Sequence, residues 1–408
     1  MTAAARKVSV LRRLSPHQHH RVTYVELFFD LVFVFAITQL SHMLLAHFTP
    51  LGVLQAGMLM LAVWWVWVFM SWVTNWLDPE RTPVRLMLFV MMLAGLLMST
   101  SIPKAFDDRG ITFAIAFVTM QVGRSVFFIF AVPRSEVHHR RNFMRIATWL
   151  SVSGVFWIAG GLCDPRTRIG LWLVALAIEY AGPAMRFRTP GLGASALQDW
   201  TVEGGHMAER CALFIIIALG ESIVVTGATF SEAVWVLPTV VAFVIALLGS
   251  IAMWWIYFHL GAEAGSHQIS RSSDSGRLAR LAYTYLHLPI VAGIVVCAVG
   301  DELLLAHPDG HSGAKEQLSM IGGPLLYLCG VILFKRCIRG HLQLSHLVGI
   351  ALLLILIPFA AQLPPLWLSG TTTAILMLVA GWEAVSLGSS GTVAEQDEAE
   401  PHVDASSA

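Results

Sequence analysis

Apolar segments about as long as a membrane is thick recur along this chain. A helix needs about 20 mainly apolar residues to cross the hydrocarbon core of a bilayer. Hydrophobic residues make up 56% of the 408 residues and charged residues 13%, whereas soluble domains carry about 25% charged residues. The sequence therefore predicts an all-α integral membrane protein. Twelve spans are expected, at residues 22–47, 51–74, 85–102, 111–132, 143–163, 168–186, 206–229, 233–260, 278–302, 318–334, 341–361 and 370–388.

The distribution of positive charge predicts the orientation of these spans, because cytoplasmic loops of membrane proteins carry an excess of Lys and Arg. If the N-terminus is cytoplasmic, most Lys and Arg residues fall in cytoplasmic segments. The loops on the other side hold only Lys104, Arg109, Arg166, Arg168 and Lys315. Twelve spans with both termini in the cytoplasm preserve this bias, so we expect that arrangement around a transmembrane domain of residues 22–388.

Both ends of the chain are polar. Residues 1–21 are expected to form a basic cytoplasmic tail, and residues 389–408, rich in Ser, Ala and acids and without Lys or Arg, a disordered one. The five cysteines are scattered through apolar segments without a CxxC pair, so neither a disulfide framework nor a zinc site is expected. We expect no metal and no cofactor.

Local matches in the same order divide the spans into two groups of six. We therefore expect a parallel internal repeat of residues 22–188 and 206–388, with the first and seventh spans facing each other across an axis along the membrane normal. In this alignment Glu26 falls on Glu209 and Thr38 on Glu221. The matching segments are 26–40 with 209–223, 64–67 with 254–257, 93–95 with 291–293 and 177–179 with 381–383.

Two carboxylates interrupt the first apolar segment. Glu26 and Asp30 are four residues apart and so lie on one face of a helix. An acid near the middle of a membrane helix costs about 2.5–3.5 kcal/mol on insertion scales, so it must pair, protonate or contact water. Two readings stay open for these acids: an ion or substrate path, or a structural pair neutralised by Arg21 or Arg210.

The seventh segment, HMAERCALFIIIALGESIVVTG, carries the densest polar stripe of the chain. Glu221 lies deep in the apolar run and is followed by Ser222, so we expect both to line an ion or substrate path. His206, Glu209 and Arg210 lie near the start of the segment, where pairing across helices is the expected role.

Further polar residues lie inside other spans. Glu179 and Glu383 occupy repeat-related positions and are expected to assist the path, and Arg124 is a candidate counter-charge for one of the acids. The pair Asp301-Glu302 closes the ninth span and reads as an interfacial cap. The Trp clusters at 64–67 and 254–255 are expected to be packing surfaces.

Common motifs of nucleotide-binding domains, hydrolases, metalloproteases and potassium-channel filters are missing from the sequence. It contains no Walker loop, no GxGxxG, no GxSxG, no HExxH and no TVGYG filter. The net charge is zero, which gives no indication of nucleic-acid binding. The expected partners are the lipid bilayer, a small ion or solute, and a second copy in a homo-oligomer.

Three stretches carry a resemblance to a known family: VELFFDLVFVFAITQL at 25–40, ERCALFIIIALGESIVVTG at 209–227 and YLHLPIVAGIVVCAVGDE at 285–302. They resemble the signature segments of the bacterial low temperature requirement A (LtrA) family. The resemblance covers roughly residues 20–388. It implies a multi-pass protein of the bacterial inner membrane with a link to growth in the cold, and it assigns neither a substrate nor catalytic residues.

The first segment is also similar to the first helix of potassium channels that carry an Arg-xxx-Phe-Ser-Asp motif. Arg21 and Asp30 match its Arg and Asp with a longer spacing, and Phe29 stands where the motif has Ser. This similarity favours ion permeation.

The leading hypothesis is thus a transporter or channel for a small cation or proton-coupled solute, with acids of the first and seventh spans lining the path. An intramembrane enzyme acting on a lipid-linked substrate is an alternative, in which Glu26, His42 and His206 would do acid–base work. A non-catalytic membrane organiser or cold sensor is a third reading.

Overall fold

The computed structural model describes residues 9–12, 21–196, 200, 203–259, 278 and 280–398, with side chains as far as residue 386. This part of the chain is built of helices. The long helices are α1 (Tyr24–Ala46), α2 (Pro50–Trp76), α3 (Thr82–Ser101), α4 (Gly110–Ala131), α5 (Val137–Leu162), α6 (Pro165–Ala184), α7 (Gly204–Glu232), α8 (Leu237–Phe258), α11 (His287–Ala306), α12 (Ala314–Arg339), α13 (Leu344–Leu356) and α14 (Pro365–Glu398). Short helical turns are η1 (Ile102–Lys104), η3 (Arg280–Tyr285) and η4 (Ile357–Gln362).

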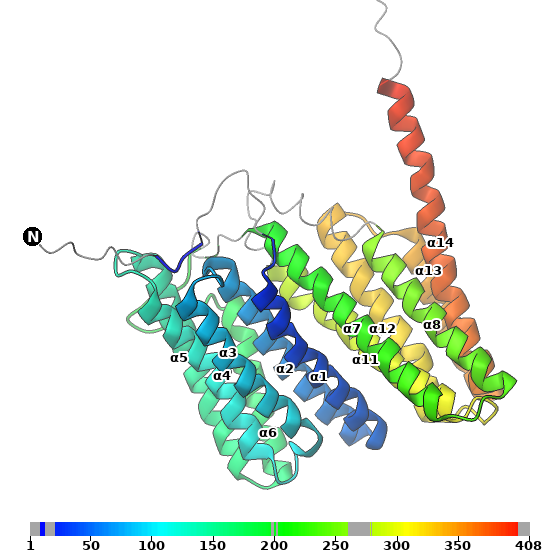
Figure 1. Cartoon of the computed structure of the whole chain (residues 1–408), viewed down its shortest axis with the longest axis horizontal. Coiled ribbons are helices and arrows are strands. Elements are labelled where there is room, and N and C mark those ends of the chain that lie inside the picture. Colours follow the sequence, from blue (N-terminus) through cyan, green and yellow to red (C-terminus); the bar gives the residue numbers. More distant parts are fainter. Residues whose placement is uncertain are drawn as a thin grey trace, which may run out of the picture.

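The helices form two adjoining groups, α1–α6 and α7–α14, which appear side by side in Figure 1. Helix α1 lies where the groups meet, and it packs against α2 and α3 of its own group and against α7 and α11 of the other. Helix α2 also contacts α7 and α11. The first helix begins and the last helix ends at the same end of the bundle (Figure 1). Which side of a membrane that end faces stays a prediction.

Eleven helices of the described chain are long and apolar enough to cross a membrane, one fewer than the twelve spans expected. The exception is α6, the expected span at 168–186. Its apolar run is diluted by Arg166, Arg168 and Glu179, and it packs against α5 and α2. The multi-pass membrane architecture is confirmed. In α6, Arg168 and Glu179 are buried and hydrogen-bonded to neighbouring segments, whereas Arg166 is exposed.

Two helices begin away from their expected positions. Helix α5 begins at Val137 rather than residue 143, because the polar segment HHRRN contains no helix breaker and extends the helix. The span expected at 278–302 is found as the candidate span Arg280–Ala306, which begins with a π-helical turn, η3, and continues as α11 from His287. Pro289 lies in the first turn of α11, where a missing N–H is tolerated, and it explains the break.

Both expected tails contain ordered residues. Helix α14 runs to Glu398, so residues 389–398 of the expected disordered tail are helical, and the remainder lies outside the described residues. Within the expected basic tail, Leu11 forms a β-bridge with Leu77. The backbone N–H of Arg12 donates to Trp76 at 2.8 Å, and that of Asp78 to Val10 at 2.9 Å. Residues 9–12 therefore attach to the end of α2.

Glycines allow α11 and α12 to pack unusually closely. A Cβ built on Gly293 would lie 2.5 Å from the backbone nitrogen of Tyr327, and one on Gly323 would lie 2.8 Å from that of Cys297. Small residues at such contacts let membrane helices approach backbone to backbone. This contact fixes the position of the acidic end of α11 relative to α12.

The two groups of helices have the same order of neighbours. In the first group α1 contacts α2 and α3, and α3 to α5 each contact the next helix; α2 also contacts α6. In the second group α7 contacts α8 and α11, α11 to α13 each contact the next helix, and α8 contacts α14. This order is the one that the expected repeat requires; the repeat itself stays a prediction.

Candidate functional site

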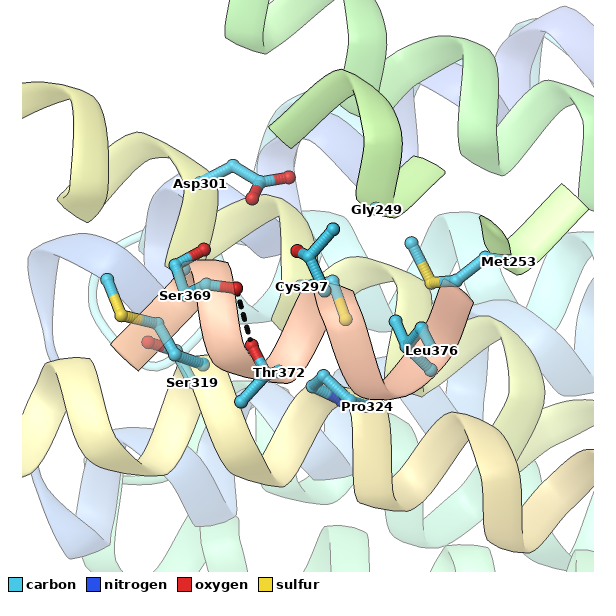
Figure 2. Close-up of a pocket in the computed structure, with 12 residues that line it drawn as sticks. Gly249, Met253, Cys297, Asp301, Ser319, Pro324, Ser369, Thr372 and Leu376 are labelled. Atoms are coloured by element: carbon cyan, nitrogen blue, oxygen red, sulfur yellow. Dashed lines mark hydrogen bonds between the residues drawn. The ribbon is translucent and has the colours of Figure 1, made fainter. Parts of the chain in front are cut away.

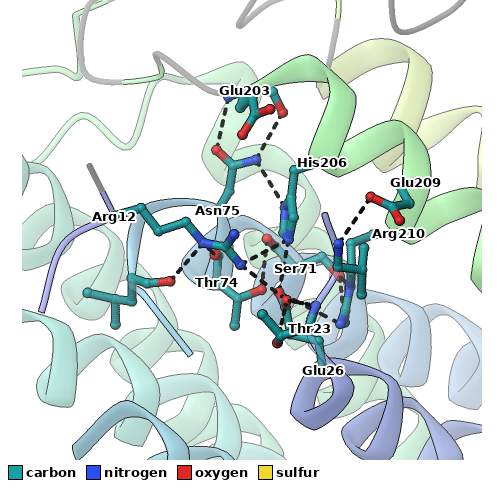
Figure 3. Close-up of polar contacts among 12 residues, drawn as sticks. Arg12, Thr23, Glu26, Ser71, Thr74, Asn75, Glu203, His206, Glu209 and Arg210 are labelled. Carbon is teal, nitrogen blue, oxygen red and sulfur yellow. Dashed lines mark hydrogen bonds and ion pairs between the residues drawn. The ribbon is translucent and has the colours of Figure 1, made fainter. Parts of the chain in front are cut away.

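Glu26 is held at the start of α1 by three different parts of the chain. The backbone N–H and the hydroxyl of Thr23 both donate to its Oε2 at 2.9 Å, as in a capping box. His206 Nε2 of α7 lies 3.0 Å from Oε1, and Arg12 Nη2 donates to Oε2 at 3.1 Å. The carboxylate has no exposed surface and is fully engaged (Figure 3).

Asp30, one turn further along α1, forms a buried ion pair with α7. Arg210 Nη2 donates to Asp30 Oδ1 at 2.8 Å, and Trp67 Nε1 donates to the same oxygen at 2.9 Å. Neither Asp30 nor Arg210 is exposed. Arg210 Nη1 also lies 3.9 Å from Glu26 Oε1. Asp30 is thus paired with Arg210 in this structure, and its place on an ion path stays a prediction.

The N-terminal segment completes this group, which we call the paired cluster: Arg12, Glu26, Asp30, His206 and Arg210. Arg12 reaches the cluster from outside the helices, and its Nε donates to the carbonyl of Thr74 at 2.8 Å. Asn75 Nδ2 lies 3.3 Å from His206 Nδ1. The paired cluster therefore joins α1, α2, α7 and the N-terminal segment. Figure 3 shows Arg12, Glu26, His206 and Arg210 of this cluster.

Aromatic side chains fill the bundle beside the paired cluster. The rings of Trp64, Trp67 and Phe214 contact one another, with centroids 4.2–5.7 Å apart, and all three are buried. Phe214 lies one turn beyond Arg210 on α7. The Trp cluster at 64–67 is thus a packing surface, whereas Trp254 and Trp255 are 45% and 39% exposed.

A second polar group lies further along α7 and differs in its partners. Glu221 lies about 16 Å beyond Arg210 along the axis of α7, because a helix rises 1.5 Å per residue. Its carboxylate accepts a hydrogen bond from Thr38 Oγ1 of α1. Asp301 and Glu302 of α11 complete what we call the acid layer: Glu221, Asp301 and Glu302. Within the described residues, no Lys or Arg forms an ion pair with any of the three. All three are half-buried.

Ser222 of α7 lies between Glu221, its neighbour in the chain, and Asp301 of α11. Its side chain is 1% exposed, and its hydroxyl interacts with the carboxylate of Asp301. The sequence singled out Glu221 and Ser222 as path residues, which stays a prediction, and read Asp301 only as a cap.

Glu179 and Glu383 lie apart from both groups, one in each half. Glu179 accepts from Ser153 Oγ at 2.6 Å, from Gln121 Nε2 at 2.8 Å and from Trp157 Nε1 at 3.0 Å. Both carboxylate oxygens of Glu383 accept from Lys335 Nζ at 2.8 Å. Neither set of hydrogen bonds reaches α1 or α7.

The remaining pairing candidates have varied surroundings. Arg124 is fully buried on α4 and interacts electrostatically with Glu179; its Nη1 donates to the carbonyl of Val66 at 3.3 Å. Glu209 accepts from the backbone N–H of Val22 at 3.1 Å. Sequence reasoning missed Arg12, because a polar segment before the first helix gives no periodic signal of where it docks.

Among the described residues, no group of three or more His, Cys, Asp and Glu side chains is arranged to hold a metal ion. The paired cluster can hold helices together, and the acid layer can attract cations.

Comparison with known proteins gives a consistent result. The family model described as bacterial low temperature requirement A protein (LtrA) matches residues 21–381. An uncharacterized protein of Rhizobium meliloti (strain 1021) is 43% identical over 372 residues, which is 90% of each chain. No solved structure matches. The chain therefore belongs to the bacterial LtrA family of multi-pass membrane proteins.

Proposed function

We propose that this protein transports a small cation, alone or coupled to a proton or solute, along the interface of α1, α7 and α11 in the bacterial inner membrane. The supporting observation is the acid layer. Glu221, Asp301 and Glu302 lie inside a membrane bundle without a Lys or Arg partner in the described chain. Carboxylates in such surroundings are costly and are kept mainly where they serve ions or protons.

The paired cluster supports a closed end for this path. Asp30 and Arg210 neutralise each other without any exposed surface, and the rings of Trp67 and Phe214 pack directly beside them. A cation entering from the acid layer therefore meets an aromatic barrier and then a bound arginine. Asp30 becomes available to the cation when α7 shifts and Arg210 releases it.

Movement between the two groups of helices would open and close this path. The matching order of helix contacts in α1–α6 and α7–α14 supports the parallel repeat, in which Thr38 and Glu221 occupy equivalent positions. These two residues contact each other between α1 and α7. Rocking of one repeat against the other around a central site is a common form of alternating access.

Ion flux into proteoliposomes tests the proposal. Purified protein is reconstituted, and Na⁺, K⁺ and proton fluxes are followed with fluorescent indicators under imposed gradients. We expect Glu221→Gln and Asp30→Asn to reduce flux to the level of empty liposomes, because each variant removes the charge that attracts the cation at its position.

Glu232→Gln is the matched control, since Glu232 ends the same helix and is exposed. It should leave flux unchanged. Equal flux in the native protein, Glu221→Gln and Asp30→Asn would reject the assignment of these acids to the path. Equal rates in loaded and empty liposomes for every cation tried would reject transport of those cations.

The paired cluster also favours a second candidate, a membrane organiser without transport. Its charges are matched inside the protein, which is the arrangement expected of helix-joining pairs. In that case Glu221→Gln changes neither stability nor any ion flux, whereas a loss of stability in Asp30→Asn is expected under both functions.

A further inference from the structure

A small cavity lies beside Asp301, between α8, α11, α12 and α14. Its volume is about 30 Å³, which is room for about two water-sized particles. The wall carries the carboxylate of Asp301 and the side chains of Ser319, Ser369, Thr372 and Thr373. Figure 2 shows Asp301 of α11 and the hydroxyl residues of α12 and α14 around this common space.

Two hydroxyl groups of this cavity, those of Ser319 and Thr372, donate their hydrogens to the helix backbone. Ser319 Oγ donates its hydrogen to the carbonyl of Lys315 at 2.8 Å, and Thr372 Oγ1 donates to that of Ser369 at 3.0 Å. A hydroxyl has one hydrogen and two lone pairs, so both oxygens can only accept from, or coordinate, whatever enters. With the carboxylate beside them, they suit a cation and repel an anion.

Pro324 interrupts the backbone hydrogen bonds of α12 next to the same cavity. It lies inside α12 and lines the cavity together with Met320. A proline has no N–H and cannot bond the carbonyl four residues before it, so the carbonyl of Met320 lacks its regular helical partner. Interrupted helices provide free carbonyls of this kind to the coupling ions of many transporters.

Ser222 lies next to this cavity. Its buried side chain interacts with the carboxylate of Asp301. A cation bound at Asp301 would therefore lie near this hydroxyl oxygen as well. Ser222 is also the neighbour of Glu221, so the cavity adjoins the acid layer through α7.

We propose that the cavity beside Asp301 binds one Na⁺, with the carboxylate of Asp301 and the hydroxyl oxygens of Ser319 and Thr372 as ligands. A single carboxylate balances a single positive charge, and oxygen ligands suit a hard cation. The small volume favours Na⁺ over the larger K⁺. This inference deepens the proposed function and rests on it for the role of the ion in transport, but the binding itself is independent of transport.

Thermal unfolding of the detergent-purified full chain tests the binding. NaCl is raised from low millimolar to 100 mM while choline chloride keeps the ionic strength constant, with KCl and CaCl₂ as parallel series. We expect Na⁺ to raise the unfolding midpoint by about 2–4 °C, as a ligand present well above its dissociation constant does. Asp301→Asn should abolish this shift, and Thr372→Val, which keeps the shape of the side chain, should require a higher Na⁺ concentration for the same shift.

Asp309→Asn is the control, because Asp309 is exposed in the loop after α11, and it should retain the full Na⁺ response. An equal response to Na⁺, K⁺ and choline, or an undiminished Na⁺ response in Asp301→Asn, overturns the site. If Asp301→Asn fails to fold, Thr372→Val and Ser319→Ala test the site instead. If both variants need the same Na⁺ concentration as the native protein for the same shift of the unfolding midpoint, the site is also overturned. Ion flux without a Na⁺-dependent shift of the unfolding midpoint would support transport and reject this Na⁺ site. A Na⁺-dependent shift without ion flux would support the Na⁺ site and reject transport.

Discussion

At the scale of single residues, the buried acids differ more in their ion-pair partners than in how deeply they are buried. Asp30 is fully buried and bound to Arg210, whereas Asp301 has no cationic partner in the described chain. In a low-dielectric interior, a paired charge is tolerable and an unpaired one is costly. In this structure Asp30 therefore joins helices, and on the proposed function a cation reaches it only after Arg210 releases it, whereas Asp301 can receive a cation directly.

Removing one member of the Asp30–Arg210 pair should be costly. Asp30→Asn leaves Arg210 with only the carboxylate of Glu26, 3.9 Å away, so we expect a loss of about 3 kcal/mol in the free energy of unfolding, the low end of the range for a broken buried pair. Asp30→Leu with Arg210→Met should lose less than Asp30→Leu alone. Denaturant unfolding in detergent measures this coupling.

Glu80→Gln provides the baseline for that experiment, since Glu80 is exposed before α3, and it should change the unfolding free energy by less than about 0.5 kcal/mol. Strictly additive losses for the two members of the pair would show that they do not stabilise each other.

At the scale of elements, close packing of α11 on α12 positions the acidic end of α11. Gly293 and Gly323 leave no room for a side chain, because the nearest atoms are backbone atoms of the other helix. Helices held this closely cannot slide without losing the contact. The cavity at Asp301, which both helices line, therefore depends on these glycines.

Gly293→Ala should push the two helices apart, because the new Cβ would lie 2.5 Å from the backbone nitrogen of Tyr327. We expect a loss of about 1–3 kcal/mol of stability, as for overpacked cores. Gly322→Ala is the matched control on α12, since nothing lies within 4 Å of its Cβ position, and it should cost nothing. Thermal unfolding compares the two; equal stability would contradict the close packing.

At the scale of the whole molecule, buried polar contacts tie the two groups of helices together. Arg210 bonds Asp30, and Trp64 Nε1 and Trp72 Nε1 donate to the backbone and side-chain oxygens of Thr284 at 2.7 and 3.0 Å. Each contact joins α1 or α2 to a residue of the second group. The groups are thus held by specific pairs as well as by apolar surface.

Halves expressed as separate chains, divided between residues 196 and 203, should therefore associate in the membrane. We expect a tag on residues 203–408 to recover residues 1–196 after detergent extraction. Arg210→Gln should reduce the recovery, because it leaves Asp30 buried without its partner. Arg141→Gln, at an exposed position of α5, should not. Loss of association in the native pair would show that the covalent connection, rather than these contacts, holds the halves together.

The sequence by itself determined the membrane class, most of the helices and the need of each buried acid for a partner or water, because these follow from local apolar length and from the cost of a charge in hydrocarbon. It also indicated that the segments around Asp30 and Glu221 belong to adjacent helices. Only the tertiary structure decided which acid has which partner. Asp30 and Arg210 are 180 residues apart, Arg12 docks from a segment without helical periodicity, and Asp301 faces a cavity that four helices enclose. Contacts between distant segments depend on how helices pack, and the sequence pattern of one helix does not specify which side chains of other helices face it.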